Sequence, residues 1–133
     1  MSNIVSTITA LPDLLPLNPA PKEEVIRAEE QLGLHFSDEY KEYVLEFGAI
    51  LADGIELTGI AKSKNRNVVN VTLQERELNP SIPNNLYVIE NVGIEGIIIW
   101  QDENGGIYRS VSDHAPTIIA SSLVEYIEGK MKK

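Results

Sequence analysis

The sequence contains no cysteine. A chain without thiols forms no disulfide, and it offers neither a zinc–thiolate site nor a thiol nucleophile. Nothing in the composition points to an oxidising compartment, so we expect a cytoplasmic protein.

Residues 1–20 contain no lysine or arginine, and three prolines interrupt the apolar residues of this segment. A secretory signal has a positively charged start and an unbroken apolar core, so the segment does not fit one. The sequence also has no apolar run as long as a membrane-spanning helix requires. We expect residues 1–20 to form a short helical turn and an extended lead-in that packs on the core, and we expect no membrane contact.

Basic residues are scarce in this chain. Eleven Lys and Arg stand against twenty Asp and Glu, which gives a formal net charge of −9. Such a charge repels nucleic acid and anionic lipid and attracts a basic partner, although solubility alone also explains it. We therefore expect no nucleic-acid binding. The length of 133 residues fits one domain, which we assign to residues 1–133.

Motifs of known catalytic sites are absent: there is no phosphate-binding loop, dinucleotide fingerprint or Gly-x-Ser-x-Gly elbow. Asp113 and His114 are neighbours, but neighbours on a strand point to opposite faces and cannot form a relay. Asp102, Glu103 and Asn104 are similar to the start of a calcium loop, which would need glutamate rather than aspartate at position 113. We expect no catalytic residue, cofactor or metal, and a small enzyme that uses Asp113 and His114 is the alternative.

Residues 21–32 and 37–47 predict two consecutive amphipathic helices, with apolar side chains recurring at helical spacing in both. Gly33 can take the left-handed conformation that ends the first helix, and Ser37 is a good cap for the second. The acids of the first helix, Glu23, Glu24, Glu29 and Glu30, are expected to form only a solvated face. The two apolar faces consist of Val25, Ala28 and Leu32, and of Tyr40, Tyr43, Val44 and Phe47.

These helices carry a family signature. Residues 25–34 read VIRAEEQLGL and residues 37–44 read SDEYKEYV. Both runs resemble the opening signature of the SUKH superfamily, the Smi/Knr-type proteins, although Ser37 stands where proline is common and Gly48-Ala49 where Asn-Gly-Gly is common. The resemblance, which covers roughly residues 18–127, implies a single α+β domain. In bacteria it implies an immunity protein that binds and neutralises a toxin, and in fungi a regulatory or scaffold protein.

Residues 49–60 predict a turn followed by a strand. The turn covers residues 49–54, and residues 55–60 alternate as a half-buried strand does, with Glu56 and Thr58 directed outward. Residues 68–78 match both a strand and a helix pattern. We predict a helix there, because its second half consists of good helix formers, because Asn67 can cap it and because the family resemblance suggests one.

The second half of the chain predicts an antiparallel meander. Residues 86–89 and 97–100 are apolar runs typical of central strands, and residues 102–106 form a hairpin loop before a third strand. Ser122 and Glu125 form a capping box for a last helix, whose core-facing residues are Leu123, Tyr126, Ile127 and Met131. The predicted fold is therefore a single α+β domain in which an antiparallel meander packs with about four helices.

Acidic residues in turns and at strand ends form the candidate partner-binding surface, because an antiparallel sheet tends to gather such positions at its rim. Trp100 ends the most apolar strand and is either a core residue or an aromatic anchor for the partner. The candidate partner-binding residues are Asp53, Glu56, Glu90, Glu95, Trp100, Asp102 and Glu103.

The resemblance to the SUKH superfamily implies a non-catalytic immunity protein that neutralises a cognate toxin of a bacterial polymorphic toxin system, and this is the function that we predict. The negative charge favours a basic toxin of the nuclease type. An intracellular regulatory or scaffold module of the Smi/Knr type is the alternative within the same family. We expect the chain itself to be a monomer or a weak dimer.

Overall fold

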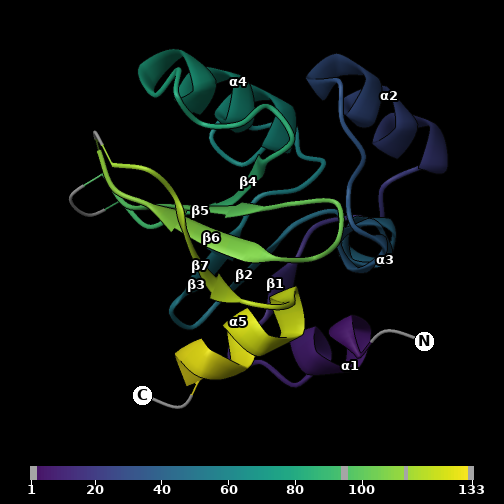
Figure 1. Ribbon diagram of the computed structural model, residues 1–133. Helices are drawn as coiled ribbons and strands as arrows, with labels where there is room; N and C mark the ends of the chain where they lie inside the picture. Colours follow the sequence, from purple (N-terminus) through teal and green to yellow (C-terminus); the bar gives the residue numbers. More distant parts are fainter. Residues whose placement is uncertain (1–2, 94–95, 113, 132–133) are drawn as a thin grey trace.

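The computed structural model of the chain describes residues 3–93, 96–112 and 114–131. Over these residues it contains five helices and two antiparallel sheets, one of three strands and one of four. The predicted α+β fold is thus confirmed (Figure 1). None of the described helices is long and apolar enough to cross a bilayer.

The predicted helix pair is present as α2 (Lys22–Leu32) and α3 (Asp38–Phe47). Gly33 ends α2 with a φ angle of 68°, and Ser37 caps α3 by accepting a hydrogen bond from Tyr40 N at 3.0 Å. The prediction that Glu29 only faces water is wrong. Its Oε2 accepts a hydrogen bond from Phe36 N at 2.8 Å, so this side chain fixes the connection between the two helices.

The N-terminal lead-in packs on the core, as predicted, through α1 (Ile4–Thr9), in which Ile4 and Ile8 are buried. Its extended part forms β1 (Leu15–Pro16), which pairs with β2 (Ile50–Ala52). Residues 49–54 were expected to be a turn, but β2 occupies half of this segment and only its end turns into β3 (Ile55–Leu57). The difference arises because β1 and β3 supply backbone partners from both sides, which a local pattern does not reveal.

Thr58, which follows β3, was expected to point outward but is buried. Its hydroxyl lies 3.0 Å from the Tyr40 hydroxyl and donates a hydrogen bond to Val88 O at 2.8 Å. Because its partners come from two other elements, Thr58 satisfies its hydrogen-bonding capacity inside the core.

The helix predicted at residues 68–78 is confirmed as α4 (Val68–Leu78). Asn67 caps it, because its Oδ1 accepts hydrogen bonds from Val69 N at 2.9 Å and Asn70 N at 3.3 Å. Helix α4 packs beside α2, and its side chain Arg76 donates a hydrogen bond to Leu32 O at the end of that helix.

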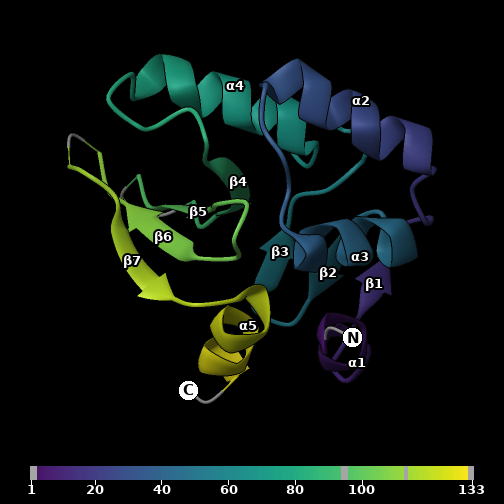
Figure 2. The same ribbon diagram turned by 45° about the vertical axis from the view of Figure 1, so that its right-hand side comes forward.

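The antiparallel meander is also confirmed. It consists of β4 (Tyr87–Asn91), β5 (Ile98–Gln101), β6 (Ile107–Ser110) and β7 (Thr117–Ala120), in that order. Strand β7 was not predicted, because three of its four residues are exposed and give no alternating pattern. Figures 1 and 2 show α2 and α4 together on one side of the meander and α5 (Leu123–Met131) with α1 on the other.

Helix α5 begins at the predicted cap, where Ser122 Oγ accepts a hydrogen bond from Glu125 N at 3.0 Å. The Glu125 carboxylate accepts from Ser121 N rather than from Ser122 N, so only half of the capping box forms as predicted. Leu123, Tyr126 and Ile127 are buried, whereas Met131, which was also expected in the core, is exposed.

Candidate partner-binding surface

The predicted acidic rim divides into two surfaces, because its residues lie on hairpins of two different sheets. Asp102 and Glu103 lie on the β5–β6 hairpin, next to α3 (Figure 1). Asp53 and Glu56 belong to the β2–β3 hairpin, which forms a separate hollow. Glu95, another candidate of the prediction, lies outside the described residues.

Trp100 is a core residue and not a surface anchor, because its side chain is fully buried. It lies in an apolar cluster between α4 and the meander, and its Nε1 donates a hydrogen bond to Ser110 Oγ at 2.9 Å. An aromatic ring with no accessible surface cannot contact a partner without rearrangement of the core. The other buried members of this cluster are Val71, Ile82, Leu86, Val88 and Ile98.

Glu90 was expected at the rim but is buried in a hydrogen-bond network. Its Oε2 accepts a hydrogen bond from Glu56 N at 2.9 Å, and its Oε1 accepts from Lys130 Nζ at 2.7 Å and from the Tyr126 hydroxyl. Burial raises the pKa of Tyr126, and the neighbouring Glu90 charge raises it further. Glu90 therefore joins β3, β4 and α5, and its role is structural.

Asp102 shapes the β5–β6 hairpin. Its Oδ1 accepts hydrogen bonds from Asn104 N at 2.9 Å and Gly106 N at 3.0 Å, and its Oδ2 accepts from the Tyr108 hydroxyl at 2.9 Å. The hydrogen bond to Asp102 raises the pKa of Tyr108. These contacts hold the tip of the hairpin, where Glu103 is exposed.

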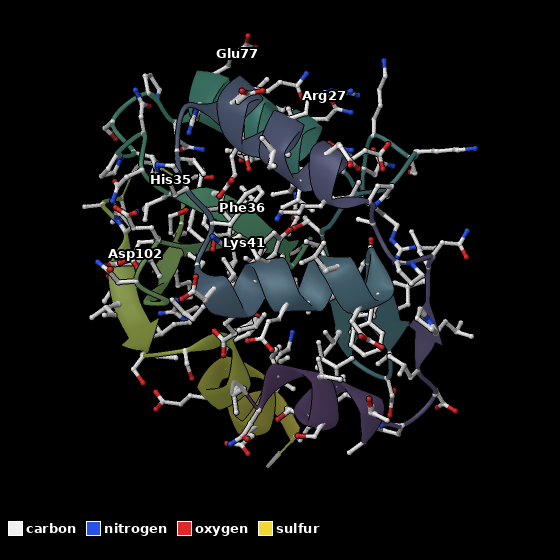
Figure 3. All side chains as sticks on the ribbon, turned by 90° about the vertical axis from the view of Figure 1, so that its right-hand side faces the viewer. Arg27, His35, Phe36, Lys41, Glu77 and Asp102 are labelled. Carbon is white, nitrogen blue, oxygen red and sulfur yellow. The ribbon has the colours of Figure 1, made fainter. Side chains whose placement is uncertain are left out.

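A hollow of about 580 Å³ lies between this hairpin, the start of α3 and the start of α5. We call it the acidic groove, because Asp38, Glu39 and Glu103 line it and no lysine or arginine is among its described lining residues. In Figure 3, Asp102 lies beside the start of α3, at this end of the molecule. The other lining residues are Asn3, Ser37, Asn104, Gly105, Ser121, Ser122 and Val124.

The carboxylates of the groove differ in their availability. The Asp38 side chain is 99% exposed, and its nearest cation, Lys41 Nζ, is 3.7 Å away, which makes a weak surface pair. Glu39, by contrast, accepts hydrogen bonds from Leu123 N at 2.6 Å and Val124 N at 3.0 Å, so it caps α5. Asp38 and Glu103 are therefore the carboxylates of the groove that a partner can reach.

A buried polar network is hydrogen-bonded to three residues that line the groove, Ser37, Glu39 and Gly105. The Tyr87 hydroxyl donates a hydrogen bond to Gln101 Oε1 at 2.8 Å and accepts one from Ser37 N at 3.0 Å. Gln101 Nε2 donates to Gly105 O at 3.1 Å and to Glu39 Oε1 at 3.2 Å. Burial raises the pKa of Tyr87, so its hydroxyl stays protonated and available to donate. This network fixes α3, the hairpin and α5 relative to one another.

Sequence reasoning identified Glu103 but missed the other two acids of the groove. Asp38 and Glu39 lie in the first turn of α3, where acids commonly stabilise a helix, so their position alone does not indicate a binding surface. Their proximity to Glu103 depends on contacts between α3, β5 and α5, which are far apart in the sequence. A glutamate in the first helical turn that also caps a second helix leaves no local signal.

The chain matches the family model SUKH_5, described as SMI1-KNR4 cell-wall, over residues 1–132. The chain belongs to the SUKH family. Family membership thus extends beyond the segment in which the opening signature was identified, and it includes α1 and all but the last residue of the chain. No curated protein matches this SUKH chain.

The alternative site around His114 has little support in the geometry. The imidazole is exposed, and its Nδ1 lies 2.9 Å from Ser112 O. Asp113, its proposed partner, lies outside the described residues. Among the residues that the structure does describe, no three His, Asp or Glu are grouped closely enough to hold a metal ion.

Proposed function

We propose that this SUKH-family chain is a non-catalytic immunity protein that binds a basic protein toxin at the acidic groove. The observation that carries the proposal is the combination of two reachable carboxylates, Asp38 and Glu103, with a lining that has no lysine or arginine among its described residues. Family membership is compatible with this role, and a nuclease-type toxin, whose substrate groove is basic, fits the charge.

A rigid groove suits this task. The carboxylates lie on α3 and on a hairpin whose loop conformation is fixed by Asp102, and the buried network beneath them connects both to α5. Little side-chain and loop entropy is lost when such a surface binds, so more of the interaction energy contributes to affinity. The net charge of −9 adds long-range attraction that accelerates the encounter with a basic partner.

The test compares two double neutralisations in cells that also produce a basic protein toxin against which the unchanged protein protects. Asp38→Asn with Glu103→Gln should reduce protection and slow association, and rising salt should slow association of the unchanged protein. The matched control is Glu23→Gln with Glu24→Gln, because these acids occupy the first turn of α2, as Asp38 does in α3. Equal protection by the two double variants would exclude the acidic groove as the interface.

A further inference from the structure

The loop between β3 and α4 has a charge opposite to that of the chain as a whole. Residues 58–67 contain Lys62, Lys64 and Arg66 and no acidic residue, in a chain with a net charge of −9. Lys62 and Arg66 line a hollow of about 700 Å³, which also borders residues 16–21 and the start of α2. Hollows of this size are typical of sites for small ligands. We call this hollow the Arg66 pocket.

The guanidinium of Arg66 has two buried nitrogens without a hydrogen-bond partner, Nε and Nη2. None of the ion pairs in the described part of the chain includes Arg66. Arg76, in contrast, donates hydrogen bonds to Leu32 O and Asn84 O. Buried polar groups are nearly always hydrogen-bonded in folded proteins, so two unpaired donors on one cation make Arg66 a candidate binding residue.

The two unpaired nitrogens match the geometry of a carboxylate. Nε and Nη2 form one edge of the planar guanidinium, and a carboxylate binds such an edge through two parallel hydrogen bonds. Neither nitrogen is open to solvent, so the side chain must turn toward the pocket to bind. This rotation breaks no hydrogen bond of Nε or Nη2, and binding then forms two.

Two helices begin at the Arg66 pocket. Pro21, at the start of α2, and Asn67, at the start of α4, both line it. The helices lie side by side in the same direction (Figure 2), since Arg76 near the end of α4 donates to Leu32 O at the end of α2. A helix N-terminus carries partial positive charge, so both helices favour an anion at this position.

The remaining lining residues favour an anion of single charge with an apolar body. Glu24, in the first turn of α2, repels a dianion such as phosphate, and the net charge of −9 acts in the same direction. Leu17 is exposed and Ile60 is partly exposed in the pocket, so an apolar ligand group would remove apolar surface from water there. The apolar wall also includes three prolines: Pro16, Pro19 and Pro21.

We propose that the Arg66 pocket binds a monocarboxylate with an apolar body. The carboxylate accepts two hydrogen bonds from Arg66, Lys62 adds positive charge, and the apolar group covers Leu17 and Ile60. Small aliphatic acids and the C-terminus of a peptide that ends in an apolar residue share this chemistry.

This site is separate from the acidic groove. Ala20, in the wall of the Arg66 pocket, donates a backbone hydrogen bond to Val44 O in the last turn of α3, at 3.1 Å. The acidic groove lies at the start of the same helix, where Asp38 and Glu39 line it. Failure of one proposal therefore leaves the other standing.

The first test is a titration of the unchanged chain with N-acetyl-leucine, followed by amide NMR spectroscopy. We expect saturable shifts in residues 59–67 and a dissociation constant of about 1 mM or below, as is usual for a ligand of this size. N-acetyl-leucinamide has the same apolar body without the charge and should bind at least about tenfold more weakly. Equal binding of acid and amide, tighter binding of inorganic phosphate, or no saturation below about 10 mM would overturn the proposal.

The second test uses two matched variants. Arg66→Gln should weaken binding of N-acetyl-leucine at least about tenfold, whereas Arg27→Gln, on the exposed face of α2 and outside the pocket, should not weaken it. Without ligand, Arg66→Gln should unfold within about 2 °C of the unchanged protein, because the guanidinium has no hydrogen bond to lose. A variant that binds normally, or one that is clearly less stable, would contradict the assignment of Arg66.

A short peptide that ends in leucine distinguishes the two sources of the carboxylate. Tighter binding of the peptide than of N-acetyl-leucine assigns the pocket to peptide C-termini, and equal or weaker binding assigns it to small acids. Either result supports the proposal only when the same peptide with a C-terminal amide binds at least about tenfold more weakly. Equal binding of the peptide acid and the peptide amide would overturn it.

Discussion

Glu39 Oε1 lies 2.6 Å from the backbone nitrogen of Leu123, 84 residues further along the chain. A side chain in the first turn of α3 thereby caps the start of α5. The first backbone N–H groups of a helix have no partner within the helix, and a carboxylate is a favourable acceptor for them. The acidic groove is formed around this contact.

Removal of the Glu39 carboxylate should destabilise the protein. Glu39→Ala leaves Leu123 N, Val124 N and Gln101 Nε2 without this acceptor, and we expect the free energy of unfolding to fall by about 2–3 kcal/mol. Glu39→Gln should lower the free energy of unfolding by less, because the amide oxygen of glutamine can still accept a hydrogen bond from the start of α5. Asp38→Ala is the control and should change stability by less than about 1 kcal/mol. Urea denaturation measures all three, and equal values for Glu39→Ala and Asp38→Ala would contradict the capping role.

Trp100 should matter for stability rather than for binding. Trp100→Ala opens a cavity between α4 and the meander and should lower the free energy of unfolding by about 3–5 kcal/mol. Ser110→Ala leaves the indole N–H unpaired in the core and should lower it by about 1–3 kcal/mol. A Trp100→Ala protein that unfolds like the unchanged chain, but no longer binds its partner, would show that the ring acts at the surface.

Alkaline pH should unfold this protein cooperatively. Burial raises the pKa values of Tyr40, Tyr43, Tyr87 and Tyr126 above the ordinary value of 10.0, so these hydroxyls stay protonated in the folded state. In the unfolded chain they ionise above about pH 10. Their contribution is therefore fully present below that pH and is lost as the pH rises, by about 1.4 kcal/mol per pH unit for each tyrosine.

Tyr126→Phe isolates one of these protons. The variant loses the hydrogen bond to Glu90, which lowers its stability at neutral pH. Above about pH 10 the stability of the variant should nevertheless fall less steeply with pH than that of the unchanged protein. The reason is that one tyrosine fewer releases a proton when the variant unfolds. Urea denaturation at several alkaline pH values gives the slopes, and an unchanged slope would mean that Tyr126 ionises as readily in the folded state as in the unfolded one.

Gly33 and Gly48 both have a positive φ angle, 68° and 73°, but only Gly33 lies in the left-handed helical region, because ψ is 33° at Gly33 and −64° at Gly48. A Cβ on Gly33 would have nothing within 4 Å, so Gly33→Ala should cost only the left-handed backbone strain of about 1 kcal/mol. A Cβ on Gly48 would lie 2.1 Å from Asn18 O, so Gly48→Ala must also displace the N-terminal segment. Thermal unfolding should show the Gly48 variant to be at least about 2 kcal/mol less stable than the unchanged protein, and two equal losses would contradict the close approach.

The helices of this fold could be predicted because their signals are local. Gly33 and Ser37 mark the end of α2 and the start of α3 in the sequence, and Asn67 marks the start of α4. Strands β1 and β7 could not be predicted in this way. Each is short and exposed and depends on one partner strand from elsewhere in the chain. Its sequence therefore shows no regular alternation of apolar and polar residues.

The candidate site was harder to predict than the fold. Turn and strand-end positions directed the prediction to Glu103, which is exposed, and also to Glu90 and Trp100, which are buried. Charge and position alone do not distinguish an acid that faces solvent from one that accepts three hydrogen bonds, as Glu90 does. That distinction depends on Glu56, Tyr126 and Lys130, which come together only in the folded chain.

The capping contact of Glu39 also determines when the acidic groove can exist. The groove needs Leu123 and Val124 as well as α3, so a nascent chain that has not yet emerged from the ribosome as far as α5 has no complete binding surface. If the proposed function holds, protection would begin only after residues 123 and 124 have left the ribosome and packed on α3.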